Sequence, residues 1–145
     1  MNLEWKLTKG PWDGEPDRLE FRSHGFACLA KRNMVMGFWC GYVGLPPEHP
    51  LYGKDYNQVE ETHDIRVHGG LTYSALCNEA IGICHKPAPG EPEDLFWLGF
   101  DCAHGGDLEP AIRALGFGFH AVYRDLEYVK QECEQLADQL EKVKG

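Results

Sequence analysis

The sequence lacks the features that would place a chain of 145 residues outside the ordinary globular class. No apolar run approaches the roughly 18 residues of a transmembrane helix, so we expect no membrane span. The first residues, Met-Asn-Leu-Glu-Trp-Lys, carry an early acid and have no apolar core, and we expect no signal peptide. Internal repeats and low-complexity tracts are also absent. These observations predict a single domain covering residues 1–145.

Basic residues are scarce, since 14 Lys and Arg stand against 23 Asp and Glu and the net charge is −9. A protein that binds duplex nucleic acid needs a basic face, so this class of partner is excluded. A small phosphorylated or nucleotide-type ligand is still compatible with the charge. Backbone N–H groups and one or two arginines are enough to hold such an anion.

The chain has no Cys-x-x-Cys pair, although it contains six cysteines. Without a secretion signal, and in a chain of this size, we expect reduced thiols rather than three disulfides. Half of the cysteines lie in apolar runs, where a cysteine is usually a small core residue, namely Cys28, Cys40 and Cys102.

Short segments with alternating or continuous apolar residues predict an α+β fold. We expect a mostly antiparallel sheet of five to six strands, after an irregular N-terminal segment over residues 1–17. The expected strands are 18–24, 26–31, 36–43, 65–74, 81–85 and 95–101. A short helix is expected over residues 108–115.

Residues 122–144 predict one long amphipathic helix. Its apolar positions recur every three or four residues and form a single stripe of Leu126, Val129, Cys133, Leu136, Leu140 and Val143. One interpretation packs this stripe across one face of the sheet. The other pairs the helix with its own copy in a homodimer.

The best candidate for a functional site begins at the last expected strand, which ends in Asp101 and is followed by His104, a Gly-Gly pair and Asp107. A buried strand that delivers acidic and imidazole groups onto a glycine loop often builds a site. Asp101 and His104 are therefore candidate catalytic residues, with His68 as a third member. If the strands that carry them are neighbours, Asp101 can orient His68 for acid–base work.

In the expected strand 65–74, side chains alternate, so His68, Thr72 and Ser74 share one face with a glycine between them. Such a face can form the floor of a ligand pocket, with Thr72 and Ser74 donating hydrogen bonds. The alternative is an edge strand with a solvated polar face.

Asp101, His104 and Asp107 are spaced by three residues and are potential ligands of Zn²⁺ or Mn²⁺. Asp107 has a second interpretation as the N-cap of the next helix. A structural zinc site of Cys84 and His85 with Cys102 and His104, or a Cys102 nucleophile activated by His104, are further alternatives.

Three residues outside these stretches are candidate ligand contacts. Tyr52 and Tyr56 lie in a proline-rich segment that could cover or stack on a ligand, and Arg124 could hold an anionic group. Loop packing and a surface ion pair are the alternatives.

Several motifs resemble those of a widespread family of small phage- and prophage-encoded proteins over roughly residues 40–140. The motifs are Gly41–Gly44, His49–Gly53, His68–Ser74, Ile83–His85, Trp97–Asp107 and Tyr123–Val129. The resemblance implies a phage accessory gene product that acts in the bacterial cytoplasm. Such products often counter host defences, some by cleaving or sequestering nucleotide second messengers.

Three functions follow as hypotheses. The first is a hydrolase, metal-dependent or acid–base, that acts on a small phosphorylated or nucleotide-type molecule. The second is a binding protein that sequesters a nucleotide second messenger without chemistry. The third is an inhibitor of another protein that acts through the C-terminal helix.

Overall fold

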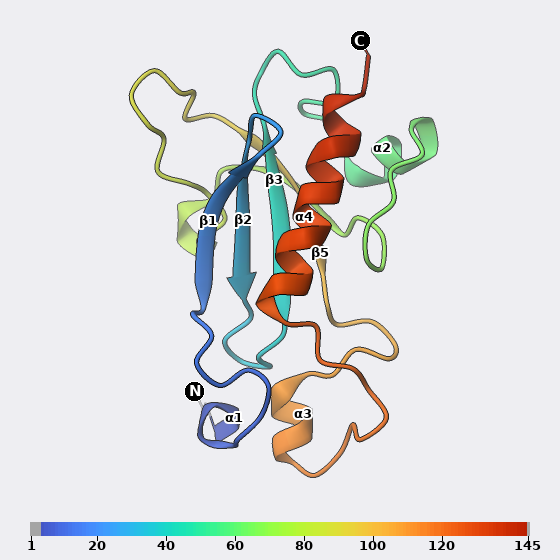
Figure 1. The fold of residues 1–145 in the computed structure, drawn as a ribbon. Coiled ribbons are helices and arrows are strands. Elements are labelled where there is room, and N and C mark those ends of the chain that lie inside the picture. Colours follow the sequence, from blue (N-terminus) through green and yellow to red (C-terminus); the bar gives the residue numbers. More distant parts are fainter. Residues whose placement is uncertain (1–3, 145) are drawn as a thin grey trace.

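Five antiparallel strands form one sheet, and the C-terminal helix α4 (Leu126–Glu141) lies across one of its faces (Figure 1). This computed structural model describes residues 4–144. The strands follow the order β1-β2-β3-β5-β4 and comprise β1 (Arg18–Ser23), β2 (Phe26–Arg32), β3 (Trp39–Leu45), β4 (Tyr73–Leu76) and β5 (Phe96–Asp101). The predicted α+β fold is thereby confirmed. Within the described residues, no helix has both the length and the apolar character needed to cross a membrane.

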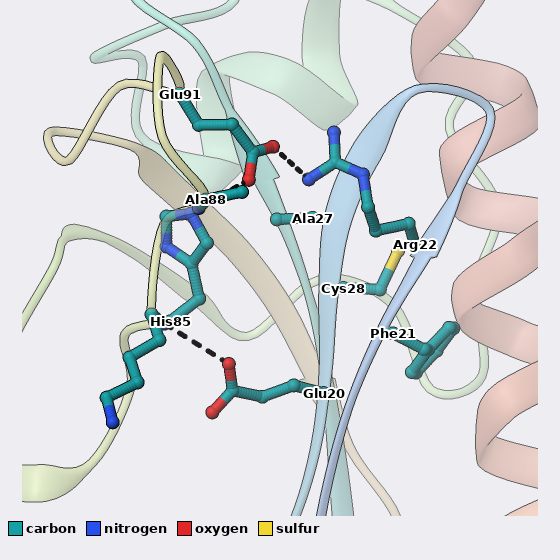
Figure 2. A pocket seen from close by; sticks show the side chains of 9 residues that line it. Glu20, Phe21, Arg22, Ala27, Cys28, His85, Ala88 and Glu91 are labelled. Carbon is teal, nitrogen blue, oxygen red and sulfur yellow. Dashed lines mark hydrogen bonds and ion pairs between the residues drawn. The ribbon is translucent and has the colours of Figure 1, made fainter.

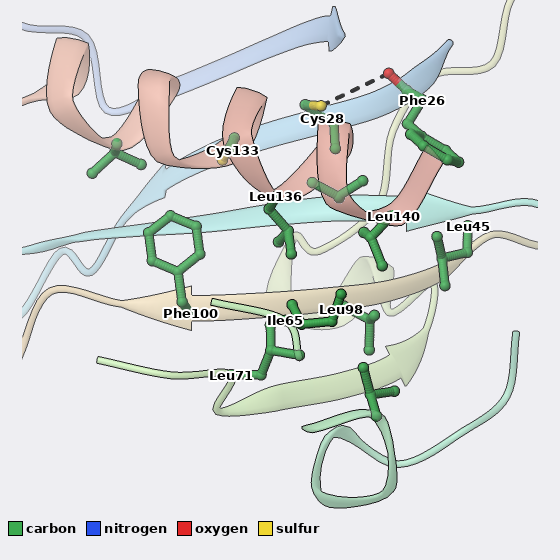
Figure 3. Packing of buried hydrophobic residues seen from close by; sticks show 14 of the residues in the cluster. Phe26, Cys28, Leu45, Ile65, Leu71, Leu98, Phe100, Cys133, Leu136 and Leu140 are labelled. Carbon is green, nitrogen blue, oxygen red and sulfur yellow. Dashed lines mark hydrogen bonds between the residues drawn. The ribbon is translucent and has the colours of Figure 1, made fainter. Parts of the chain in front are cut away.

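The apolar stripe of α4 is buried against the sheet, as the first of the two interpretations of this helix predicts (Figure 3). Cys133, Leu136 and Leu140 have no exposed surface and pack with residues of the central strands such as Leu98. Gly41 of β3 permits this approach, because a Cβ there would lie 2.6 Å from the sulfur of Cys133. The centre of the stripe is therefore enclosed within one chain, and the helix offers no apolar surface there for a homodimer.

The opposite face of the sheet is covered by the long connection between β4 and β5. Trp97 is fully buried on this face, and Ile83 of the connection packs against it. The same connection contains a disulfide between Cys77 and Cys84, so the expectation that all thiols are reduced is wrong. A backbone bridge between Asn78 and Ile83 turns the chain back on itself and brings the two cysteine Cα atoms to 4.7 Å.

Three expected elements differ from the structure. The strand expected over 65–74 is regular only in β4, because Gly69 and Gly70 have φ values of +69° and +82° that break an extended chain. The strand expected over 81–85 is replaced by the 3-10 helix η1 (Glu79–Ile81) and the single bridge of Ile83. The proline-rich loop ends in helix α2 (Tyr56–Thr62), which begins with a capping box.

The N-terminal segment folds onto the end of the sheet. It contains helix α1 (Glu4–Leu7), which packs against the short helix α3 (Pro110–Ala114). Trp5 and Trp12 are buried and form a small second core with Leu108. This core lies at the end of the molecule where the chain enters α4 (Figure 1).

Arg32 of β2 is only 1% exposed, and its ion pairs attach the N-terminal segment to the sheet. Its guanidinium pairs with Glu15 and Asp17 and lies 4.5 Å from the centre of the Trp39 ring. Glu15 also accepts hydrogen bonds from the Tyr123 hydroxyl and from the backbone N–H of Leu126. A buried charge is stable only when it is paired and hydrogen-bonded in this way. Residues before β1 are consequently part of the fold.

Candidate functional site

Three separate segments meet beyond the C-terminal end of β5. They are the turn that contains His68, the loop from Asp101 to Asp107, and the first two turns of α4. The cluster they form, which we call the His104 cluster, consists of His68, Thr72, Asp101, His104, Asp107, Arg124 and Tyr128.

Asp107 is the centre of the cluster and its side chain is only 2% exposed. One carboxylate oxygen accepts hydrogen bonds from Nε2 of His68 at 2.8 Å and from the backbone N–H of His104 at 3.0 Å. The other oxygen accepts from Nε of Arg124 at 3.0 Å. Burial alone would raise the pKa of Asp107, but these three donors together hold it below its ordinary value. Asp107 is therefore an ionised structural centre.

Two expectations about the aspartates are wrong. Asp107 does not cap the following helix, because the N-cap of α3 is Glu109 and makes no side-chain capping bond. His68 is oriented by Asp107 rather than by Asp101. The turn at Gly69 and Gly70 directs His68 toward α4, since the expected strand alternation is lost there.

Both ring nitrogens of His68 are occupied. Because the Asp107 carboxylate only accepts, Nε2 of His68 donates to it, and Nδ1 of the same ring forms a hydrogen bond of 2.7 Å with the Tyr128 hydroxyl. Its backbone N–H donates to Glu132 at 2.8 Å. His68 is thus a positioning residue that links the loop to α4. Tyr128 is not among the predicted site residues, and its one signal in the sequence is an aromatic ring off the apolar stripe.

Asp101 and His104 form the accessible part of the cluster. Nε2 of His104 lies 3.1 Å from Oδ1 of Asp101, within ion-pair distance but without hydrogen-bond alignment. The other oxygen of Asp101 accepts from the Thr72 hydroxyl at 3.1 Å. About a third of each side chain is exposed, with values of 34% for His104 and 29% for Asp101. The structure thus places three of the predicted site residues, Thr72, Asp101 and His104, side by side.

Arg124 completes the accessible face. Its Nε is bonded to Asp107, and its guanidinium lies 5.0 Å from the centre of the Tyr128 ring. Among the described residues, its two terminal nitrogens have no hydrogen-bond partner, and 29% of the side chain is exposed. The hydrogen bond to Asp107 raises the pKa of Arg124 above its already high ordinary value. The residue therefore presents a fixed, permanently charged donor pair.

The expected Zn²⁺ or Mn²⁺ site is not assembled. Within residues 4–144, the only group of three potential ligands close enough for one ion is His24, Asp138 and Glu141. The ligand atoms of Asp101, His104 and Asp107 do not all lie within 4.8 Å of one another, and both oxygens of Asp107 also bind protein donors.

The two cysteine alternatives do not fit the structure either. Cys84 is bonded to Cys77, which removes it from the zinc set that included His85. Cys102 is 1% exposed, and burial raises the pKa of its thiol far above the ordinary value. A thiol held protonated inside the core cannot act as a nucleophile.

The other predicted ligand contacts lie away from the cluster. Ser74 accepts from the backbone N–H of Tyr56, and its hydroxyl reaches Asp55 at the start of α2. The hydroxyl of Tyr52 donates to the backbone carbonyl of Asp94, just before β5 begins. These residues fix α2 and the preceding loop at the opposite end of β5 from His104.

A cavity of about 260 Å³ lies beside β1 and β2, under the loop that carries His85 (Figure 2). Three of its charged side chains are already paired within the protein. Arg22 forms an ion pair with Glu91, and Glu20 accepts from the backbone N–H of Lys86. The Lys86 ammonium has no ion pair among the described residues, but it shares the lining with the carboxylates of Glu20 and Glu91. The His104 cluster, where an imidazole, a carboxylate and a guanidinium meet, is the better candidate site.

No protein-family model, curated protein or solved structure matches the chain. The function must therefore be inferred from the geometry of the cluster.

Proposed function

We propose that the protein is a hydrolase of a small phosphorylated or nucleotide-type molecule, with acid–base chemistry at His104. The observation that carries the proposal is the arrangement of Arg124 and His104 around one carboxylate, Asp107. Within residues 4–144, the terminal nitrogens of Arg124 have no hydrogen-bond partner and can bind an anion. The His104 ring is about one third exposed and lies beside the Asp101 carboxylate, with its Nε2 atom buried. An anion donor and an imidazole paired with a carboxylate in one cluster are groups that phosphate-ester hydrolysis can use.

In this proposal each residue has one task. The guanidinium of Arg124 binds the phosphate oxygens, preferably in a bidentate fashion. His104 takes a proton from the attacking water as the water oxygen bonds to phosphorus and the ester P–O bond breaks. Asp101 stabilises the imidazolium that forms, and this imidazolium returns the proton to the leaving oxygen. Thr72 and the backbone N–H of Ala103 hold Asp101 in place through hydrogen bonds of 3.1 Å each. His68, locked between Asp107 and Tyr128, positions the loop.

The proposal retains the biological setting that the sequence motifs imply, namely a phage accessory protein in the bacterial cytoplasm. A nucleotide signal would then be the substrate class, and its hydrolysis would weaken a host response. Sequestration of the same signal without chemistry is the competing function at this site.

Incubation with a panel of mononucleotides, dinucleotides and cyclic nucleotides, followed by chromatography of the denatured mixture, separates these functions. Turnover by the unaltered protein that falls at least about a hundredfold in His104→Ala and Asp101→Asn would support acid–base hydrolysis. His120→Ala is the matched control, because His120 is exposed and lies outside the cluster. Full turnover in both cluster variants would refute the proposal. Recovery of bound but unchanged ligand would replace it with sequestration.

A further inference from the structure

A second cavity, of about 360 Å³, opens between the N-terminal segment and the loop that follows α3. Pockets for small ligands usually measure about 300–1,000 Å³, so this one is large enough and the cavity of Figure 2 is not. Its walls include Lys9, Trp12, Arg113, Phe119 and Tyr123. The residues come from three separate parts of the chain, and none of them belongs to the His104 cluster.

The charges on these walls are all of one sign. Lys9 and Arg113 line the cavity, and no carboxylate does. Neither residue forms an ion pair within the described part of the chain, although the protein has 23 acidic and only 14 basic residues. In so acidic a protein, two cations without carboxylate partners at one cavity indicate an anionic ligand.

The remaining walls are aromatic. Nε1 of Trp12 donates to the backbone carbonyls of Trp5 and Thr8, and the Tyr123 hydroxyl donates to Glu15. Since these polar atoms are already bonded, Trp12 and Tyr123 contribute ring carbon to the lining. Their rings are packed edge to face at 5.5 Å and are therefore held rigidly.

Phe119 and Arg113 form the outer wall. The Arg113 guanidinium lies 4.2 Å from the centre of the Phe119 ring, and 66% of Phe119 is exposed. An exposed aromatic ring with a cation stacked on it can receive a planar group on one side and an anion on the other. The wall is thus suited to a ligand that carries both.

From this combination we infer that the cavity binds a planar anion of the mononucleotide class, with its ring against Phe119 and its phosphate between Lys9 and Arg113. The site is separate from the His104 cluster. Leu108 and Tyr123 line the cavity, whereas their chain neighbours Asp107 and Arg124 bind each other in the cluster. Binding here does not depend on hydrolysis at His104.

Titration calorimetry of the full chain with adenosine 5′-monophosphate tests the inference. Adenosine lacks the phosphate and ribose 5-phosphate lacks the ring, and each should bind at least about fivefold more weakly than the nucleotide. Arg113→Gln and Lys9→Gln should each weaken the nucleotide about tenfold, because each removes a charge-assisted contact. Lys54→Gln, which neutralises an exposed lysine of the proline-rich loop, should leave affinity unchanged.

Equal affinity for nucleotide and adenosine would overturn the inference, as would unchanged binding in both cation variants or no binding at millimolar concentration. The His104→Ala variant distinguishes the two sites. It should bind the nucleotide normally, whatever its effect on turnover. If His104→Ala abolished binding and Arg113→Gln did not, the nucleotide would occupy the His104 cluster and the cavity would not be its site.

Discussion

Replacement of Asp107 by asparagine is the sharpest test of how the His104 cluster is held together. The carboxylate accepts from His68, His104 and Arg124 within 3.0 Å, and its side chain is 2% exposed. Asparagine keeps one acceptor but turns an NH₂ group toward one of these donors. Breaking a buried charge pair typically destabilises a protein by about 3–5 kcal/mol. Because Arg124 is 29% exposed and partly screened, we expect about 3 kcal/mol here.

Urea unfolding followed by tryptophan fluorescence measures this difference at pH 7. Since the folded-state pKa of Asp107 lies below the ordinary value for a free aspartate, its contribution is fully present above that ordinary value. The contribution is lost as the pH falls through the folded-state pKa, so the two proteins should converge in acid. Asp64→Asn is the control, because Asp64 is 80% exposed and pairs with an equally exposed Arg66. A loss below about 0.5 kcal/mol at pH 7, or a difference that does not shrink as the pH is lowered below the ordinary carboxyl range, would refute the assigned role of Asp107.

Three further predictions concern the surroundings of the site. Gly69→Ala should displace the His104 ring, because a Cβ there would lie 2.2 Å from Cδ2 of His104. The NMR signals of the His104 imidazole should therefore shift. Gly53→Ala is the control, because Gly53 also has a positive φ but has open space around its Cα, and this variant should leave the His104 signals unchanged. Reduction of the Cys77–Cys84 disulfide, which closes a sequence separation of 7, should lower stability by roughly 2–3 kcal/mol in urea. Six free thiols in the unreduced protein would contradict this. Leu136→Ala should cost about 2–5 kcal/mol because the side chain has no exposed surface, and a smaller loss would mean that α4 is not packed as described.

The parts of the fold that could be predicted are those with a strong local pattern. The spacing of the apolar stripe predicted the position of α4, and the apolar run over residues 95–100 predicted β5. The strand expected over 65–74 failed because apolar content does not reveal that two glycines adopt positive φ. The disulfide could not be seen either, since it depends on a turn that brings Cys77 and Cys84 together. In both cases the backbone conformation of a turn decided the outcome.

The candidate site, like the fold, could be predicted from the sequence only in part. Asp101 and His104 are three residues apart on one loop, so their proximity could be read from the sequence. The partner of His68 could not, because His68 and Asp107 are 39 residues apart in the sequence and the turn at Gly69 and Gly70 breaks the expected strand. Tyr128 was overlooked for a related reason. A tyrosine on the polar side of a helix appears solvent-exposed until the turn it contacts is known.

The bonds of Glu15 have a consequence for how the protein is made. They join it to Tyr123 and Leu126, across 108 and 111 residues of chain. At roughly 5–20 residues per second, a ribosome needs about 5–20 seconds to supply these partners after Glu15 itself. During that interval the second cavity lacks its Tyr123 wall and the His104 cluster lacks Arg124. Both sites therefore appear together, at the end of synthesis, and a nascent chain that carries all of the sheet still has neither.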